Sequence, residues 1–293
     1  MKVLFYGSKG WIGQQLLQLL NDGNHSVFEG LARVENKEEV ESEIKNIVPT
    51  HIICCIGRTH GKIGSVVYPT IDYLEQPGKI YDNVRDNLFS PIVLALLCTK
   101  YNIHLTYMGT GCIFSYDETH PFGQEINGFT EQSKPNFIGS SYSIVKGFTD
   151  ELMHLMESNV LNIRIRMPIT SDNNSRNFIT KISNYKKICS IPNSMTVLPE
   201  LLPYMIDMAD RKITGTVNLV NPGLISHNEI LEMYKNTVDN NFAWENFTIE
   251  EQDLILAAKR SNNFLDSTKL ESLYPNVTNI RDSVANVLKK YKH

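Results

Sequence analysis

The sequence predicts an α/β protein with a doubly wound parallel sheet and a smaller C-terminal domain. Short apolar runs alternate with stretches of helical periodicity through the first half of the chain, which is the pattern of repeated strand–helix–strand units. The 293 residues suffice for two small domains or for one large domain with an appendage. After Pro168 the pattern changes to short helices with frequent Pro and Asn, so we expect domains at 1–168 and 169–293.

Each expected element rests on its own pattern, because apolar runs predict strands and apolar residues at helical spacing predict helices. The strands expected in the first domain are 3–6, 25–28, 51–56, 104–108 and 161–166, and the helices are 11–20, 36–48, 82–101 and 141–157. Asn36 with Glu39 three residues later is typical of a capping box, and Pro49 ends that helix. The second domain is expected to contain a strand at 215–220, short helices after the capping pairs Ser226/Glu229 and Thr248/Glu251, and a terminal helix at 279–291.

Composition excludes several classes of protein. The 28 Lys and Arg residues against 32 Asp and Glu residues give a net charge of −4, so neither nucleic acid nor an anionic membrane is expected as the main partner. No apolar stretch reaches the ~18–20 residues of a membrane helix, and the N-terminal apolar run is too short for a signal peptide, which predicts a soluble cytoplasmic protein. The cysteines are odd in number and lack CxxC spacing, which predicts neither a disulfide framework nor a metal site.

A glycine-rich segment follows the first predicted strand and opens a helix, with its glycines at GxxGxxG spacing. Gly7 permits a tight turn, Gly10 lets the backbone approach a pyrophosphate, and Gly13 lets the helix pack closely on the strand. The helix N-terminus then faces the phosphates. A plain glycine-rich turn is the alternative, but the position between strand and helix favours a dinucleotide. The expected contacts, including one glycine after the third strand, are Gly7, Lys9, Gly10, Trp11, Ile12, Gly13 and Gly57.

The end of the second predicted strand bears on the choice between NAD and NADP. Glu29 near this end would bind the ribose hydroxyls, whereas Arg33 just beyond it favours a 2′-phosphate. Lys9 in the glycine loop adds a second positive charge. Two cations against one acid favour NADPH, with NADH as the alternative cofactor and a solvated loop residue as the alternative role for Arg33.

Tyr142 and Lys146 form a Tyr-x-x-x-Lys motif on a predicted helix. Residues four apart share a helix face, so the ammonium can stabilise a developing phenolate. Such a Tyr can protonate a carbonyl oxygen as a hydride arrives. Thr110, just past the fourth strand, is placed to hydrogen-bond the same oxygen, or is an ordinary turn residue. The motif is common by chance and gains weight from the glycine loop at the start of the chain.

Longer segments resemble one known family. They are MGTGCIF at 108–114, GSSYSIVK at 139–146, RMPI at 166–169, RNFITK at 176–181, IPNSMT at 191–196, NPG at 221–223, SHNEI at 226–230 and RSNN at 260–263. With them, essentially the whole chain resembles the bifunctional UDP-4-keto-6-deoxyglucose 3,5-epimerase/4-reductases, nucleotide-rhamnose synthases among the extended short-chain dehydrogenases/reductases. The resemblance implies a Rossmann-type first domain and a nucleotide-sugar-binding second domain. It also implies NADPH-dependent conversion of UDP-4-keto-6-deoxy-D-glucose to UDP-L-rhamnose in one active site.

The resemblance assigns roles that composition alone does not. Cys112 matches the family's epimerisation cysteine and Lys181 its partner, although a buried hydrophobe and a surface lysine would be the default readings. The protons at sugar carbons 3 and 5 lie alpha to the ketone, so a thiolate and an opposing acid can exchange them. Lys146 also holds the nicotinamide ribose in the family. Asn177 and Arg260 are candidate contacts to the diphosphate or sugar, with a salt-bridged surface residue as the alternative for Arg260.

Two expectations concern partners. A dehydratase of this class would need its own glycine loop and the chain has one, so a separate 4,6-dehydratase is expected to supply the substrate. The resemblance also implies a homodimer through the helices at 82–101 and 141–157. The apolar residues that suggest this surface, or alternatively ordinary core, are Val93, Leu94, Leu96 and Leu97.

Two other functions compete with the bifunctional enzyme. One is a 4-keto reductase alone, of the dTDP-4-dehydrorhamnose reductase type, in which Cys112 and Lys181 are structural. The other is a noncatalytic regulatory subunit that binds a nucleotide on the same fold. The intact set of Thr110, Tyr142 and Lys146 argues against the second alternative.

Overall fold

A computed structural model of the protein describes residues 1–291, which divide into two compact units. Unit 1 comprises Met1–Thr110, Ser140–Arg164 and Leu202–Val217, and unit 2 comprises Gly111–Gly139, Ile165–Leu201 and residues 218–291. Both units are discontinuous in the sequence, so compactness alone does not divide the chain at residue 168. The expected division of binding roles between 1–168 and 169–293 stays a prediction.

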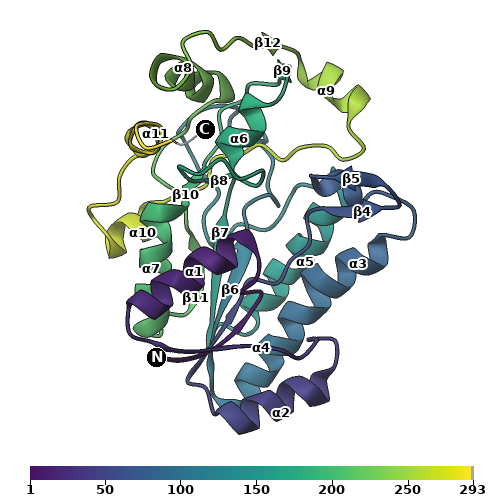
Figure 1. The fold of residues 1–293 in the computed structure, drawn as a ribbon, viewed down its shortest axis with the longest axis vertical. Helices are drawn as coiled ribbons and strands as arrows, with labels where there is room; N and C mark the ends of the chain where they lie inside the picture. The colour runs from purple at the N-terminus through teal and green to yellow at the C-terminus, as the bar shows by residue number, and fades with distance from the viewer. Residues whose placement is uncertain (292–293) are drawn as a thin grey trace. The chain divides into compact units, whose positions relative to one another are not determined.

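A six-stranded sheet forms the centre of unit 1 (Figure 1). Its strands in spatial order are β11 (Gly215–Asn218), β7 (Val160–Ile165), β6 (His104–Thr110), β3 (His51–Cys54), β1 (Lys2–Tyr6) and β2 (Ser26–Glu29). β1 pairs in parallel with both β2 and β3, and β3 pairs in parallel with β6. The strand order therefore reverses at β1, and doubly wound sheets bind ligands at the carboxyl ends of the strands beside such a switch point. The predicted fold class is confirmed.

The central strands form where the sequence is apolar. Every residue of β3, β6 and β7 is buried, as expected for strands covered on both faces. Leu4, Ile52 and Leu105 come from three neighbouring strands and join one core, to which α4 (Ser90–Tyr101) contributes Leu94 and Leu97. Figure 1 shows α4 beside α5 (Ser141–His154) on one face of the sheet and α1 (Trp11–Asp22) on the other.

The remaining helices of unit 1 follow the predictions with one difference. Asn36 accepts a hydrogen bond from the Glu39 amide and so caps α2 (Lys37–Ile47), which is one half of the capping box expected there. The single helix expected at 82–101 is instead α3 (Ile80–Val84), a π-helical segment η2 (Arg85–Phe89) and α4. No pattern in the sequence had suggested the antiparallel pair β4 (Gly61–Ile63) and β5 (Val66–Tyr68) or the short 3-10 turn η1 (Ile71–Tyr73).

Unit 2 is built from short elements. They are β8 (Pro168–Ile169), α6 (Phe178–Ser183), β9 (Lys187–Ile188), β10 (Thr196–Val197), α8 (His227–Thr237), β12 (Glu245–Asn246), α9 (Ile249–Ile255), α10 (Thr268–Leu273) and α11 (Ile280–Leu288). The capping boxes predicted at Ser226 and Thr248 are present and open α8 and α9. A helix that the sequence did not suggest, α7 (Leu198–Asp210), begins in unit 2 and ends in unit 1.

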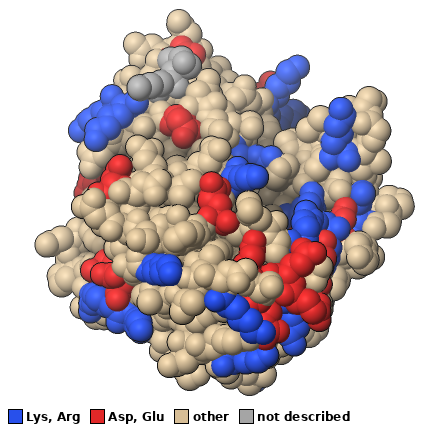
Figure 2. All heavy atoms as spheres, turned by 60° about the horizontal axis from the view of Figure 1, so that its bottom comes forward, with Lys and Arg blue, Asp and Glu red and all other residues tan. Residues whose placement is uncertain are grey.

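The surface carries charges of both signs. Figure 2 shows acidic and basic side chains interspersed on the face that α2 contributes to. There Glu41 pairs with Lys45 at 3.4 Å and with Lys100 at 2.6 Å. Among residues 1–291, no helix combines the length and the apolar character that crossing a membrane requires.

Candidate active site

The glycine loop joins β1 to α1 with close backbone contacts. Gly7 has a φ of +86°, and a Cβ there would lie 2.6 Å from the carbonyl carbon of Cys55. A Cβ at Gly13 would lie 2.2 Å from the Gly7 carbonyl oxygen, so only glycine lets α1 approach the strand this closely. Because the N-cap of α1 is Gly10, no capping side chain occupies the N–H groups that begin the helix. The loop thus has the geometry of an anion-binding helix start.

The two residues that bear on cofactor choice differ in their surroundings. Glu29, the last residue of β2, accepts a hydrogen bond from the Ser8 hydroxyl at 2.5 Å and is thereby tied to the glycine loop. Arg33 is two-thirds exposed and pairs with Glu35 at 3.1 Å. Lys9 in the loop is exposed. All three side chains are exposed, and both Glu29 and Arg33 have a partner within the fold, so charges of both signs remain accessible to a ligand here.

The predicted catalytic pair lies on α5. Ser140 caps this helix by accepting a hydrogen bond from the Ser143 amide, and Tyr142 and Lys146 follow one turn apart. Both side chains are buried, with exposed fractions of 8% and 4%. The predicted third member, Thr110, is also buried and is the last residue of β6.

A residue that the sequence did not suggest, Tyr107 of β6, joins this pair. Its hydroxyl accepts a hydrogen bond from the Lys146 ammonium, which also lies 4.6 Å from the centroid of the Tyr107 ring. Burial raises the pKa of Tyr107 well above its usual value, and the nearby charges of Cys54 and Tyr142 act in the same direction. Tyr107 is therefore a neutral phenol, able to accept from the ammonium while remaining protonated. Its strand meets the helix only through tertiary packing, so no spacing rule could have found it.

Lys181, the predicted partner in epimerisation, lies on α6 in unit 2 among other cations. Burial lowers its pKa to about 8, and the positive charges of Arg176 and Arg260 add to this effect. Cys112, also in unit 2, acts on Lys181 in the opposite direction, so the two groups lie within electrostatic reach. Among residues 1–291, the ammonium of Lys181 has no hydrogen-bond acceptor. An amine in this state can exchange a proton with a ligand near neutral pH.

The segment that leads to Cys112 is held by a buried polar network. The Arg166 guanidinium is almost fully buried and donates to the Gly111 carbonyl at 3.2 Å and to the Ser261 hydroxyl at 2.9 Å. The Asn263 amide donates to the same Gly111 carbonyl at 2.9 Å. Arg166 comes from the RMPI segment, and Ser261 and Asn263 come from the RSNN segment, so the network accounts for the polar residues of both. The network fixes the main chain one residue before Cys112.

The two predicted substrate contacts differ. Asn177 is fully buried and caps α6, and its amide donates to the Thr170 carbonyl at 2.9 Å and the Asp172 carbonyl at 2.7 Å. Both amide protons therefore have acceptors within the fold, which gives Asn177 a positioning role in this structure. Arg260 is half-buried and donates to the Ala258 carbonyl at 2.6 Å. Direct substrate contact by either residue stays a prediction.

Comparison with known proteins gives the family. No family model matches the chain. The bifunctional dTDP-4-dehydrorhamnose 3,5-epimerase/dTDP-4-dehydrorhamnose reductase of Arabidopsis thaliana is 44% identical, over 96% of this chain and 90% of its own. A trifunctional UDP-glucose 4,6-dehydratase/3,5-epimerase/reductase of the same plant is also 44% identical, but the chain spans only 41% of its length.

A solved structure agrees with these relatives. The UDP-rhamnose synthase of Acanthamoeba polyphaga mimivirus superposes with a TM-score of 0.94 at 53% identity, covering 99% of each chain. The resemblance seen in the sequence is thereby confirmed: the chain belongs to the nucleotide-rhamnose synthase family of bifunctional 3,5-epimerase/4-reductases.

Proposed function

We propose that the protein converts UDP-4-keto-6-deoxy-D-glucose to UDP-L-rhamnose by 3,5-epimerisation followed by NADPH-dependent reduction of the 4-ketone. The observation that carries the proposal is the Lys181 environment in unit 2. A reductase alone has no need for a buried lysine with a lowered pKa within reach of a cysteine. The names of the plant and mimivirus relatives support the same pair of reactions.

The residues of unit 1 suit the reductive step. The nicotinamide cofactor supplies the hydride that reaches sugar carbon 4. Tyr142 donates its phenolic proton to the ketone oxygen, and Lys146 stabilises the phenolate that remains. Thr110 donates a hydrogen bond to the same oxygen. Lys146 also holds the nicotinamide ribose, and Tyr107 keeps the ammonium in place through their hydrogen bond.

The residues of unit 2 suit the proton transfers. Cys112 as thiolate removes the proton at carbon 3 or carbon 5, which leaves an enolate whose charge lies on the ketone oxygen. Lys181 returns a proton to the opposite face of the same carbon, and its lowered pKa makes it an effective acid near neutral pH. Once Cys112 has lost its proton to solvent and Lys181 has regained one, the same exchange at the second carbon completes the epimerisation. Thr110 and Cys112 are two residues apart in the sequence, since Thr110 ends the first segment of unit 1 and Cys112 is the second residue of unit 2.

NADPH is the cofactor that these surroundings favour. The residues fit a dinucleotide, because the glycine loop leaves the first N–H groups of α1 without a capping side chain. The Ser8 hydroxyl occupies one oxygen of the Glu29 carboxylate, which is otherwise exposed. Arg33 and Lys9 then contribute positive charge toward a 2′-phosphate. NADH is the weaker alternative.

The remaining partners are proposed on the same basis. A 4,6-dehydratase in the cytoplasm supplies the substrate, which the name of a trifunctional plant relative supports by joining that activity to the other two. A second copy of the chain covers an apolar surface on α3, η2, α4 and α5. Its exposed side chains are Ile80, Tyr81, Val84, Phe89, Leu96, Ile144, Phe148 and Leu152.

This surface corrects one expectation. Of the four α4 residues suggested by the sequence, Leu96 is 56% exposed, whereas Val93, Leu94 and Leu97 are buried in the core of unit 1. The reason is that α4 packs a broad apolar face against the sheet and α5 and leaves Leu96 on its outer side. Light scattering at micromolar concentration should give the mass of a dimer, and a monomer would contradict this part of the proposal.

One experiment tests the function as a whole. The purified protein is mixed with UDP-4-keto-6-deoxy-D-glucose and NADPH in heavy water, and the nicotinamide absorbance and the product are followed. We expect NADPH to be consumed and deuterium to enter both carbons 3 and 5 of an L-rhamno product. Reduction without deuterium incorporation would show that the protein is a 4-keto reductase alone. An unchanged absorbance would favour a noncatalytic nucleotide-binding protein.

A further inference from the structure

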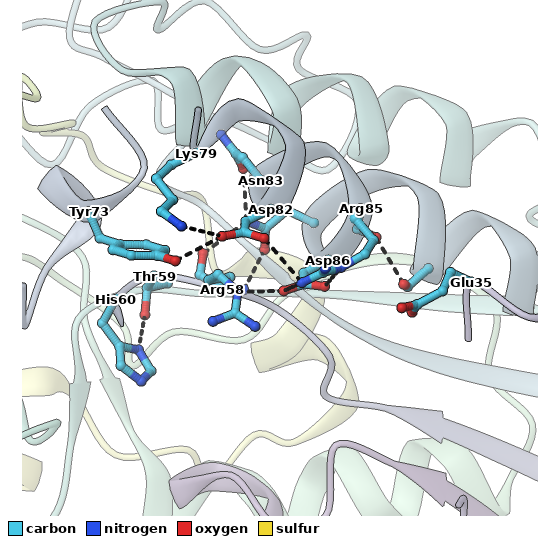
Figure 3. A network of polar contacts seen from close by, with 12 residues as sticks. Glu35, Arg58, Thr59, His60, Tyr73, Lys79, Asp82, Asn83, Arg85 and Asp86 are labelled. Carbon is cyan, nitrogen blue, oxygen red and sulfur yellow. Dashed lines mark hydrogen bonds and ion pairs between the residues drawn. The ribbon is translucent and has the colours of Figure 1, made fainter. Parts of the chain in front are cut away.

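Arg58, which the mechanism above does not use, is held in place by its neighbours in unit 1 (Figure 3). It directly follows Gly57, beyond the carboxyl end of β3. Its backbone N–H donates to the Asn87 amide oxygen at 2.8 Å, and its carbonyl accepts from the Asn87 amide nitrogen at 2.8 Å. Asn87 is fully buried and is fixed in turn by Asn83 at 2.9 Å. The main chain at Arg58 is therefore rigid.

The Arg58 side chain is anchored by only one of its three nitrogens. Its Nε donates to the Asp86 carboxylate at 2.5 Å. Asp86 and Asn87 are consecutive residues of η2, and the wider π-helical turn allows both to reach the Arg58 loop. Burial alone would raise the pKa of Asp86, but the hydrogen bonds from Arg85 and Arg58 outweigh it and lower the pKa. Asp86 is thus a carboxylate shared between two arginines.

The surrounding network leaves a positive charge unneutralised. Arg85 directs its donors to Asp86 at 2.7 Å and to Asp82 at 3.4 Å, and Lys79 also pairs with Asp82. Three cations thus face two carboxylates. Within the described residues 1–291, the two terminal amino groups of Arg58 have no acceptor, and Figure 3 shows them directed away from Asp86. The side chain is one-third exposed, so a ligand can reach it.

The position of this guanidinium relative to the glycine loop indicates its ligand. β3 pairs with β1, and the backbone at Cys55 lies so close to Gly7 that no Cβ fits there. Arg58 follows three residues after Cys55, on the same edge of the sheet. A planar guanidinium with two terminal amino groups matches the oxygens of a phosphate. Beside a loop built to bind a dinucleotide, the phosphate available is one carried by that dinucleotide.

We propose that Arg58 is a phosphate-binding residue of the cofactor site, positioned by Asp86 and Asn87, and that its terminal amino groups donate to a phosphate of NADPH. This inference rests on the proposed cofactor and adds a contact from β3 to those expected from the glycine loop and Arg33. The phosphate is either the pyrophosphate or the 2′-phosphate, and the two sources give different results with NADH.

The test is direct titration of the protein with NADPH, NADH and UDP, monitored by calorimetry. Arg58→Met should weaken NADPH binding roughly ten- to hundred-fold, which is the effect of losing charge-assisted hydrogen bonds. An equal loss for NADH identifies the pyrophosphate, and a loss confined to NADPH identifies the 2′-phosphate. Arg58→Lys keeps the charge but loses the paired donors, so its affinity should lie between those of the wild type and Arg58→Met.

Arg85→Met is the matched control, because Arg85 binds the same Asp86 but has its donors occupied within the network. It should bind NADPH with wild-type affinity, and thermal melts verify that each variant is folded. Unchanged NADPH affinity in folded Arg58→Met, or a loss for UDP in place of NADPH, would overturn the role of Arg58. If the wild type itself bound no NADPH, the proposed cofactor would be wrong, which is a different result.

Discussion

The two lysines assigned to chemistry have opposite surroundings. Lys146 in unit 1 donates to the Tyr107 hydroxyl and lies over its ring, and both contacts stabilise an ammonium. Lys181 in unit 2 has no hydrogen-bond acceptor among residues 1–291 and shares its surroundings with Arg176 and Arg260, which destabilise an ammonium. The same residue type thus has a hydroxyl and a ring for its ammonium in one unit and lies among other cations in the other.

This difference suggests how one chain combines two reactions. Reduction needs a permanent positive charge beside Tyr142, because the phenolate forms only as the hydride arrives. Epimerisation needs a group that gives up and regains a proton in each cycle, and a lysine whose pKa is about 8 does so near neutral pH. Separate removal of each function is therefore the sharpest way to test the comparison.

The largest effect is expected at the proton donor for reduction. Tyr142→Phe removes the phenolic proton but keeps the ring, so NADPH oxidation should fall by roughly a hundred- to ten-thousand-fold. Cofactor binding should change little, which a calorimetric titration can show. Deuterium exchange at carbons 3 and 5 should continue, because Cys112 and Lys181 are intact. A fully active variant would remove Tyr142 from the mechanism.

The next effect separates the proton transfers from reduction. Cys112→Ala should lose deuterium incorporation at one or both carbons, and any slow reduction should give an unepimerised 6-deoxyhexose. Lys181→Met should behave similarly, and the double variant should be little worse than either single one because both act in one sequence of transfers.

Cys189→Ala is the matched control, since Cys189 is a buried cysteine of the same unit. It should exchange protons at the wild-type rate. If Cys112→Ala did so as well, the thiol would be structural and the epimerisation mechanism would be wrong.

A smaller effect is expected on the pH dependence of exchange. Lys181 acts as the acid in its protonated form, so the exchange rate should fall as the pH rises past about 8. Arg176→Gln removes a positive charge that lowers the pKa of Lys181, so the falling limb should move to higher pH by about one unit or less. Arg281→Gln, a change at an exposed arginine of unit 2 that pairs with Glu229, is the control and should leave the limb in place. If the exchange rate of Arg176→Gln fell at the same pH as that of the wild type, Arg176 would not be one of the charges that lower the pKa of Lys181.

Much of the fold was predictable, because it follows from local pattern. The central strands are apolar runs, and the caps at Asn36, Ser226 and Thr248 form where side chain and amide are three residues apart. The π-helical segment η2 was not predictable, since it depends on Asp86 and Asn87 both reaching the loop at Arg58. Such a contact joins residues about thirty positions apart and leaves no periodic signal.

The candidate site was predictable to the extent that a motif or a family resemblance carried it. The helical spacing of Tyr142 and Lys146 predicts that they share a helix face. The burial of Lys181, in contrast, depends on how α6 packs, which the sequence of α6 does not reveal. The cap that Asn177 forms on α6 was likewise not suggested by its place in a family motif, and its predicted substrate contact stays a prediction. Tyr107 and Arg166 are both buried polar residues whose partners come from distant segments.

The smallest expected effect tests whether Tyr107 positions Lys146. Tyr107→Phe keeps the ring under the ammonium but removes the hydroxyl that accepts its hydrogen bond. Losing one such bond should lower the rate of reduction by roughly tenfold and raise the KM for NADPH, because Lys146 also holds the nicotinamide ribose. Deuterium exchange should change much less, since unit 2 supplies its acid and base.

Tyr6→Phe supplies the matched control for this last change. Tyr6 is a buried tyrosine of β1 whose hydroxyl donates to Glu43 at 2.6 Å, so its loss costs the fold a comparable hydrogen bond. It should lower the melting temperature about as much as Tyr107→Phe while leaving the KM for NADPH unchanged. If the two variants had the same kinetics, Tyr107 would be merely structural. The contrast between Lys146 and Lys181 would then rest on the ring contact of Lys146 alone.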